Sequence, residues 1–300
     1  MPSDEKLLEH VKGALLACYK AVIGKGAEGK TEVETEIDMK TVGDLAASEA
    51  LVGYFNSSGL PVVLYTEELE KPMLLSGSPV YSVIGDEIDG TYNFHRGMGM
   101  LPHGSIVGVS ASKNPKLNEF VCSGFLEFNS GNLFYAVKGK GGYVIEKWAK
   151  GGKSVAKLVT SGKKSVEDLN KVMFDFYMLS DLSKPLIEFG KEKGDVGSFA
   201  GHVALLANGT VDLFISGDNC KNPNKLKTGE EIGPLYLLVK ESGGAVLDWR
   251  GNDLGPEEVG LDRKKVFHLI VAASEELGKK VASKMSEIPE IDAYMAAKGL

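Results

Sequence analysis

The chain has 300 residues, of which 43% are hydrophobic and 25% charged, and its formal net charge is −7. These values are typical of a soluble globular protein with a core large enough to fold without a disulfide or a structural metal. The negative charge argues against duplex nucleic acid or an anionic membrane as the main partner. An acidic protein that handles an anionic substrate needs cations to offset the repulsion.

The cysteines are Cys18, Cys122 and Cys220, an odd number with no CxxC spacing. They predict neither a disulfide framework nor a zinc site, but reduced thiols in a cytoplasmic protein. The charged N-terminus is not typical of a secretory signal, and no uncharged apolar run approaches the roughly 20 residues that span a bilayer. We therefore expect a cytoplasmic protein with no membrane partner.

Apolar residues at spacings of three and four predict a helix over about 5–23, and a second helix is expected at about 43–56. The runs 61–65 and 80–84 are β-rich, and acidic residues follow both. In open α/β sheets, ligands lie outside strand ends, so these two ends are candidate binding positions.

The middle of the chain is β-rich and predicts an antiparallel meander. Its expected strands are 104–110, 124–128, 132–137 and 143–145, followed by an exposed loop at 147–157. Later strands are expected at 172–176, 211–215, 245–248 and 268–273, and helices at 181–193, 199–208, 230–242, 274–285 and 288–298. The pattern predicts a mixed α/β protein of stacked layers.

The most informative stretch is residues 83–94, Val-Ile-Gly-Asp-Glu-Ile-Asp-Gly-Thr-Tyr-Asn-Phe. It places Asp86 and Asp89 at the end of an apolar run, directly before Gly90 and Thr91. Carboxylate oxygens suit Mg²⁺, and a helix that begins near Thr91 would offer free N–H groups to a phosphate. Metal and phosphate in one place indicate phosphoryl-transfer chemistry.

Two simpler interpretations compete with this one. Asp89-Gly90 is also an ordinary turn signal, so the stretch can be a plain acidic turn. An EF-hand loop fails on spacing, because Ile88 and Gly90 occupy its third and fifth positions.

Four features appear in order along the chain: Lys40…Asp44, Thr66-Glu67-Glu68, the segment 86–91, and a later segment 197–244. Together they resemble the inositol monophosphatase/fructose-1,6-bisphosphatase superfamily of Mg²⁺-dependent, lithium-sensitive sugar phosphatases, over about residues 5–275. That family carries Gly-Glu-Glu, Asp-Pro-Ile/Leu-Asp-Gly-Thr-x-Asn-Phe, Gly-Ser-Ala, and Trp-Asp before a helix that ends in Gly-Gly. The resemblance implies an αβαβα layered sandwich: one domain, 1–300, with a metal and phosphate lobe (about 1–150) and a substrate-completing lobe (about 151–300).

The resemblance also implies site residues. It assigns the metal ligands to Glu67, Asp86, the Ile88 carbonyl, Asp89 and Glu231; catalysis to Glu67, Thr91 and Asp44; and phosphate or substrate binding to Gly90, Thr91, Ser198, Lys225 and Lys227. Two or three Mg²⁺ ions, with Mn²⁺ as a substitute, are implied, as are in-line hydrolysis without a phosphoenzyme and a homodimer. A plain alternative for the two lysines is that both are solvated loop residues.

The chain departs from the family pattern at several positions. Glu87 replaces proline, which predicts a less rigid loop with an extra negative charge. Glu231 replaces aspartate and moves the carboxylate by about 1.5 Å, so we expect the second metal to bind differently or more weakly. The preceding tryptophan is absent, and residues 216–229 have the pattern of an insertion. Phe199 and Ser216 stand at substrate-end positions, which argues against strict inositol-phosphate specificity.

The predicted function is hydrolysis of a small sugar or polyol phosphate, with inositol-1-phosphate and fructose-1,6-bisphosphate as leading substrates. The alternatives are a 3′-phosphoadenosine 5′-phosphate phosphatase and a non-catalytic, metal- or ligand-binding regulatory relative.

Overall fold

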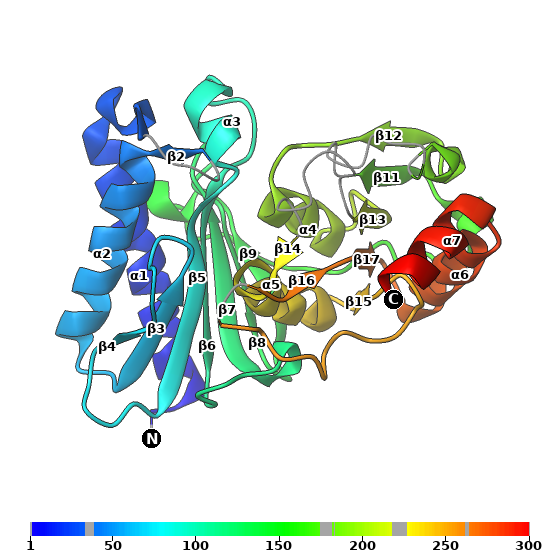
Figure 1. The fold of residues 1–300 in the computed structure, drawn as a ribbon. Coiled ribbons are helices and arrows are strands. Elements are labelled where there is room, and N and C mark those ends of the chain that lie inside the picture. The colour runs from blue at the N-terminus through cyan, green and yellow to red at the C-terminus, as the bar shows by residue number, and fades with distance from the viewer. Residues whose placement is uncertain are drawn as a thin grey trace.

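The larger sheet forms one half of the molecule. The computed structural model describes residues 2–33, 39–174, 182, 184–217, 227–261 and 264–299. Eight strands lie in the order β10-β9-β8-β7-β6-β5-β3-β4 (Figure 1). Their bounds are β3 Val62–Thr66, β4 Met73–Leu74, β5 Tyr81–Asp89, β6 Gly104–Ser110, β7 Phe120–Glu127, β8 Leu133–Val137, β9 Gly141–Ile145 and β10 Val155–Lys157. β5 to β9 pair antiparallel in chain order, which confirms the predicted meander.

Two long helices cover one face of this sheet, α1 (Asp4–Lys25) and α2 (Val42–Ser58) (Figure 1). The predicted apolar spacing in α1 is the face that packs, with Val11, Leu15 and Val22 buried against the sheet. Burial of such side chains contributes about 1.5–3 kcal/mol each. α2 begins with a capping box between Thr41 and Asp44, so this buried carboxylate both caps the helix and faces the sheet end.

A second pair of helices lies between the two sheets, α4 (Phe199–Ala207) and α5 (Gly229–Glu241) (Figure 1). Their side chains form one core with apolar residues from both sheets. The second sheet has the order β12-β11-β13-β17-β15. Its strands are β11 Lys171–Phe174, β12 Glu192–Gly194, β13 Leu213–Ser216, β15 Ala245–Leu247 and β17 Leu269–Ala272.

Helices α6 (Glu275–Ser286) and α7 (Pro289–Lys298) cover the outer face of the second sheet (Figure 1). The layers therefore alternate helix, sheet, helix, sheet, helix, which confirms the predicted αβαβα sandwich. The short elements are α3 Thr91–Arg96, β1 Glu32–Val33 paired with β2 Lys40–Thr41, β14 Lys227–Thr228 paired with β16 Val266–Phe267, and 3₁₀ turns at Glu28–Lys30, Leu117–Glu119, Trp148–Lys150, Val166–Asp168 and Pro185–Glu188. Among the described residues, no helix has the length and apolar character needed to cross a bilayer.

Two predicted segments differ in the structure. The helix expected at 181–193 is wrong for its described residues, which form a single 3₁₀ turn and then strand β12. Gly190, at φ +72°, ends the turn, and residues 192–194 pair in parallel with β11. The predicted loop at 147–157 is exposed, but residues 155–157 pair with β9 as an edge strand.

The fold brings the ends of two strands and the starts of three helices to one place. β3 and β5 run parallel, so their carboxyl ends lie side by side, with Thr66 opposite Gly85. α3 starts directly after β5, and the first turns of α4 and α5 approach the same end. Strand ends and helix N-termini together favour an anionic ligand or a cation-bridged one.

Candidate active site

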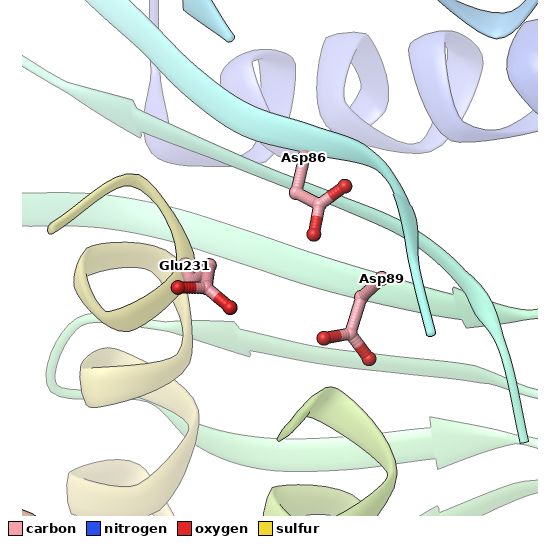
Figure 2. A group of neighbouring side chains, drawn as sticks. All are labelled: Asp86, Asp89 and Glu231. Carbon is pink, nitrogen blue, oxygen red and sulfur yellow. The ribbon is translucent and has the colours of Figure 1, made fainter. Parts of the chain in front are cut away.

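A β-bulge in β5 puts two aspartates on one side of the sheet. Residues three apart on a regular strand point to opposite faces. Here Asp86 pairs with Ile106 and Asp89 with Gly104, so β5 holds one more residue between them than β6 does. The extra residue turns both carboxylates the same way. Figure 2 shows them facing Glu231 of α5, and oxygens of all three lie within 4.8 Å of one another.

Asp86 is the carboxylate most ready to take a cation. It is 4% exposed, and its Oδ1 atom is buried without a hydrogen-bond partner in the described part of the chain. Burial raises the pKa of Asp86 well above its ordinary range, and the nearby charges of Glu67, Asp89 and Glu231 raise it further. A bound cation would reverse this by favouring the charged form. Oxygen ligands of this kind suit Mg²⁺ or Mn²⁺.

Asp89 is held by the N-terminus of α4. Its oxygens accept hydrogen bonds from the backbone N–H groups of Phe199 and Ala200, both at 3.1 Å, and from the Ser198 hydroxyl. These donors are neutral, and a carboxylate keeps further lone pairs for a metal. They fix the direction of the Asp89 side chain across 109 residues of sequence.

Glu231 lies in the first turn of α5, where its Oε2 atom accepts from the Thr228 N–H at 2.9 Å and the Thr228 hydroxyl at 3.2 Å. Its Oε1 atom lies 3.1 Å from the Lys227 ammonium group. The structure thus brings Glu231 to the aspartates, as expected, but with both oxygens engaged.

Glu67 follows β3 at the mouth of the site and has an exposed surface. Desolvation of its carboxylate, followed by the negative charges of Glu231 and Glu68, raises the pKa of Glu67. Glu68 forms an ion pair with Lys40.

Glu87 does not lie in a loop, as its replacement of proline suggested, but inside β5 with 1% of its surface exposed. Its Oε2 atom accepts from the Glu68 N–H at 3.3 Å, and the hydroxyls of Ser48 and Thr66 face it. Burial raises the pKa of Glu87 to about 7. Glu87 therefore supports the turn after β3 from the α2 side.

Thr91 and Asp44 form a hydrogen-bonded pair. The Thr91 hydroxyl lies 2.9 Å from the Ile88 carbonyl and 3.3 Å from Asp44 Oδ1. The other oxygen of Asp44 accepts from the N–H and hydroxyl of Thr41, at 2.7 and 2.5 Å. Burial raises the pKa of Asp44 to about 6, against these hydrogen bonds.

Gly90 lets the chain turn from β5 into α3. Its φ of +80° is one that L-residues with a side chain rarely adopt, and a Cβ there would lie 3.1 Å from that of Ser198. Asn93 then links this turn to a distant segment, because its amide donates to the Pro102 and Val196 carbonyls at 2.8 and 2.6 Å.

The other predicted site residues fall as follows. Ser198 reaches the site, but its hydroxyl is bonded to Asp89. Lys227 reaches it through Glu231. Lys225, and residues 218–226 of the expected insertion, lie outside the described residues.

Sequence reasoning missed three features of the site. They are the bulge between Asp86 and Asp89, the bridge made by Asn93, and the pairing of Lys227 with Glu231. Only the last left a signal, a Lys and a Glu four residues apart, which is a common surface spacing.

Comparison with known proteins places this chain in a family. The model of the inositol monophosphatase family matches residues 5–290. A fructose-1,6-bisphosphatase/inositol-1-monophosphatase of Methanothermobacter thermautotrophicus is 26% identical over 252 residues, 82% of each chain. A bifunctional NADP phosphatase/NAD kinase of Methanococcus maripaludis is 26% identical over 236 residues, which are 73% of this chain and 38% of that protein.

Solved structures show the same fold. The fructose-1,6-bisphosphatase of Leishmania major has a TM-score of 0.76 at 15% identity, with 94% of both chains covered. The IMPase of Thermotoga maritima has a TM-score of 0.68 at 18% identity, with 96% of this chain and 99% of that one covered.

An αβαβα sandwich with a cluster of carboxylates at a strand end defines a metal-dependent phosphatase. The chain belongs to the inositol monophosphatase family, and it is a phosphatase of the inositol monophosphatase and fructose-1,6-bisphosphatase type.

Proposed function

We propose that this enzyme hydrolyses the phosphate monoester of a small sugar or polyol, of the inositol-1-phosphate or fructose-1,6-bisphosphate type. The observation that carries the proposal is the carboxylate cluster of Asp86, Asp89 and Glu231, in which Oδ1 of Asp86 is buried without a hydrogen-bond partner among the described residues. A buried anionic oxygen without a donor calls for a cation. The archaeal relatives that share the family carry both activities in their names.

Asp86, Asp89 and Glu231 lie close enough to hold a metal ion, and we propose two or three Mg²⁺ ions in all, or Mn²⁺ in their place. The ligands we assign are Glu67, Asp86, the Ile88 carbonyl, Asp89 and Glu231. When bound, such ions offset the charge of the phosphate and lower the pKa of a water molecule.

The remaining roles belong to side chains around this group. With its proton donated to Asp44 or to the Ile88 carbonyl, the Thr91 oxygen is free to accept a hydrogen bond from the attacking water and so orient it. We assign to Glu67 the role of taking the proton of that water. The N–H groups of Gly90 and Thr91 would face the phosphate.

Two lysines were expected near the substrate. We keep Lys225 and Lys227 as candidates for an anionic or sugar group of the substrate, whereas we assign Ser198 to holding Asp89, because its hydroxyl is already donated there.

A second candidate substrate is a phosphate carried by a nucleotide. It is supported by the similarity to the NADP phosphatase of Methanococcus maripaludis. The related alternative, 3′-phosphoadenosine 5′-phosphate, belongs to the same test.

The test is phosphate release from inositol-1-phosphate, fructose-1,6-bisphosphate, NADP and 3′-phosphoadenosine 5′-phosphate, each with and without Mg²⁺. We expect Mg²⁺-dependent release from a sugar phosphate, inhibition by Li⁺, and loss of turnover in Asp89→Asn with the fold intact by circular dichroism. Asp168→Asn, an exposed aspartate in the other half of the molecule, is the matched control and should be fully active. Mg²⁺ binding without release from any ester would favour the regulatory alternative, and an active Asp89→Asn would contradict the metal assignment.

We also infer a cytoplasmic homodimer, with no nucleic-acid or membrane partner. Family resemblance and the net charge of −7 support these inferences.

A further inference from the structure

Lys227 and Glu231 form an ion pair inside the acidic cluster. Lys227 is the first residue of strand β14, two residues before α5 begins, and its ammonium nitrogen lies 3.1 Å from Glu231 Oε1. The two side chains are only 18% and 17% exposed, so water screens the pair less than it screens a surface pair. The same ammonium group lies 5.5 Å from the centre of the Phe199 ring, a cation–π distance. Elements on both sides of the site therefore hold this charge.

Helix stabilisation does not account for this pair. In an i, i+4 pair the favourable order is Glu before Lys, and here the lysine comes first. A positive charge also lies unfavourably at the N-terminus of a helix, where the macrodipole is positive. By contrast, the pairs Glu275–Lys279 and Glu276–Lys280 of α6 have the favourable order and are about half exposed. The partner that explains Lys227 is the acidic cluster itself.

The three cluster carboxylates differ in what already holds them. Among the described residues, Asp86 Oδ1 has no hydrogen-bond partner. The Asp89 oxygens accept hydrogen bonds from neutral donors at the start of α4, and burial raises the pKa of Asp89 while the nearby Lys227 charge lowers it. Glu231 Oε2 accepts from neutral donors of Thr228, as the Asp89 oxygens do from the start of α4, but Glu231 Oε1 faces the charged ammonium group of Lys227. A full positive charge beside that atom repels a divalent cation, which neutral donors do not do.

We propose that Lys227 is a tethered cation that competes with a divalent metal ion for Glu231, an inference that rests on the proposed function. An ion held by Asp86 and Asp89 alone does not have to displace the ammonium group from Glu231 Oε1. An ion that needs Glu231 binds only after the ammonium group has left Oε1. Lys227 thereby weakens binding at one side of the cluster, and metal occupancy there is coupled to the position of this lysine.

The experiment is isothermal titration of the metal-free protein with Mg²⁺, and with Mn²⁺, in the absence of substrate. Lys227→Met keeps the length of the side chain and removes its charge. We expect this variant to bind one more ion than the wild type, or to bind Mg²⁺ at least about tenfold more tightly. Lys227→Arg keeps the charge and should resemble the wild type. Lys279→Met removes an exposed lysine of the same spacing and should also leave binding unchanged.

A double mutant assigns the effect to Glu231. Glu231→Gln keeps a residue that can form the capping box. In the wild-type background, loss of this assigned ligand should weaken Mg²⁺ binding, but by less than in the Lys227→Met background, because Lys227 competes for Oε1. In the Lys227→Met background it should abolish the gain, since the gain requires the Glu231 carboxylate. A gain that survives in Lys227→Met/Glu231→Gln would overturn the proposal.

Asp86→Asn separates this inference from the proposed function. If Asp86→Asn loses Mg²⁺ binding while Lys227→Met binds as the wild type does, the metal site stands and the role of Lys227 is wrong. If Asp86→Asn binds Mg²⁺ like the wild type, the metal site itself is wrong, and with it both proposals. Thermal unfolding of each metal-free variant confirms that the compared chains are folded.

Discussion

At the scale of single residues, the site depends on how each carboxylate is already bonded. Asp44 gives one oxygen to the cap of α2 and the other to Thr91, so the start of a helix sets its direction. Thr91 is the first residue of α3, and its hydroxyl points back toward Ile88 and Asp44. The pair is therefore rigid before any ligand arrives, and rigid placement of a proton acceptor is what water activation needs.

Replacing Thr91 tests this arrangement. Thr91→Val keeps the shape but loses the hydroxyl, and we expect kcat to fall about 100-fold or more. Thr91→Ser keeps the hydroxyl and should retain most of the activity. Mg²⁺ affinity by titration should be similar in all three proteins, because the Thr91 side chain is not an assigned metal ligand. A wild-type kcat in Thr91→Val would contradict the role given to this hydroxyl.

At the scale of elements, the bulge in β5 and the glycine before it decide where the aspartates point. Gly85 lies beside the backbone of β6, where an added Cβ would come within 2.2 Å of the Ile106 carbonyl oxygen. Backbone atoms of a central strand cannot move aside as a flexible side chain can. The close approach of β5 to β6 therefore requires glycine at this position, directly before Asp86.

Gly85→Ala should consequently lower both stability and activity. We expect a loss of about 2–4 kcal/mol in the free energy of unfolding, measured with urea, since the strand must shift. The shift displaces Asp86, so residual activity should fall by more than about tenfold. Gly53→Ala in α2, where a Cβ meets nothing within 4 Å, is the control and should be neutral or slightly stabilising. Equal urea midpoints for the two variants would contradict this prediction, because they would show that β6 can move to make room for the added Cβ.

At the scale of the whole molecule, the layers meet at a concentration of buried acid. Burial raises the pKa of Asp44 to about 6 and of Glu87 to about 7, and it raises that of Asp86 well above its usual range. A raised pKa means that the folded state binds the proton more tightly than the unfolded chain does. The stability it contributes is present at low pH and is lost as the pH rises through about 6 to 7. A cation in the cluster favours the ionised forms instead.

We therefore expect Mg²⁺ to stabilise the protein more at pH 8 than at pH 5. His10 and His103, whose pKa values burial lowers, act in the opposite direction on the metal-free protein. The quantity to measure is therefore the difference in Tm with and without Mg²⁺ at each pH, because the contribution of the histidines is present in both measurements and cancels. It should grow between pH 5 and pH 8 and shrink at every pH in Asp86→Asn. A Mg²⁺ effect that does not grow with pH would contradict the described clustering of acids.

Much of this protein was determined by local sequence. The order of most helices and strands, the two acidic strand ends, and the start of a helix at Thr91 all follow from spacing and from residue types that act within a few positions. The resemblance added Glu67, Asp86, Asp89 and Glu231 as one group, of which the structure brings Asp86, Asp89 and Glu231 within 4.8 Å. The assigned roles, and the two lobes at about 1–150 and 151–300, stay predictions.

Tertiary structure alone decided the rest, because it depends on contacts between distant segments. The helix expected at 181–193 gave way to strand β12, since pairing with β11 outweighed its local pattern. The bulge exists only against β6, and the Asn93 amide donates to the carbonyl of Val196, which is 103 positions away in the sequence. Glu87 turned away from the cluster toward α2. Lys227 found its partner inside the acidic cluster rather than in solvent, and no spacing rule distinguishes those two places for a lysine.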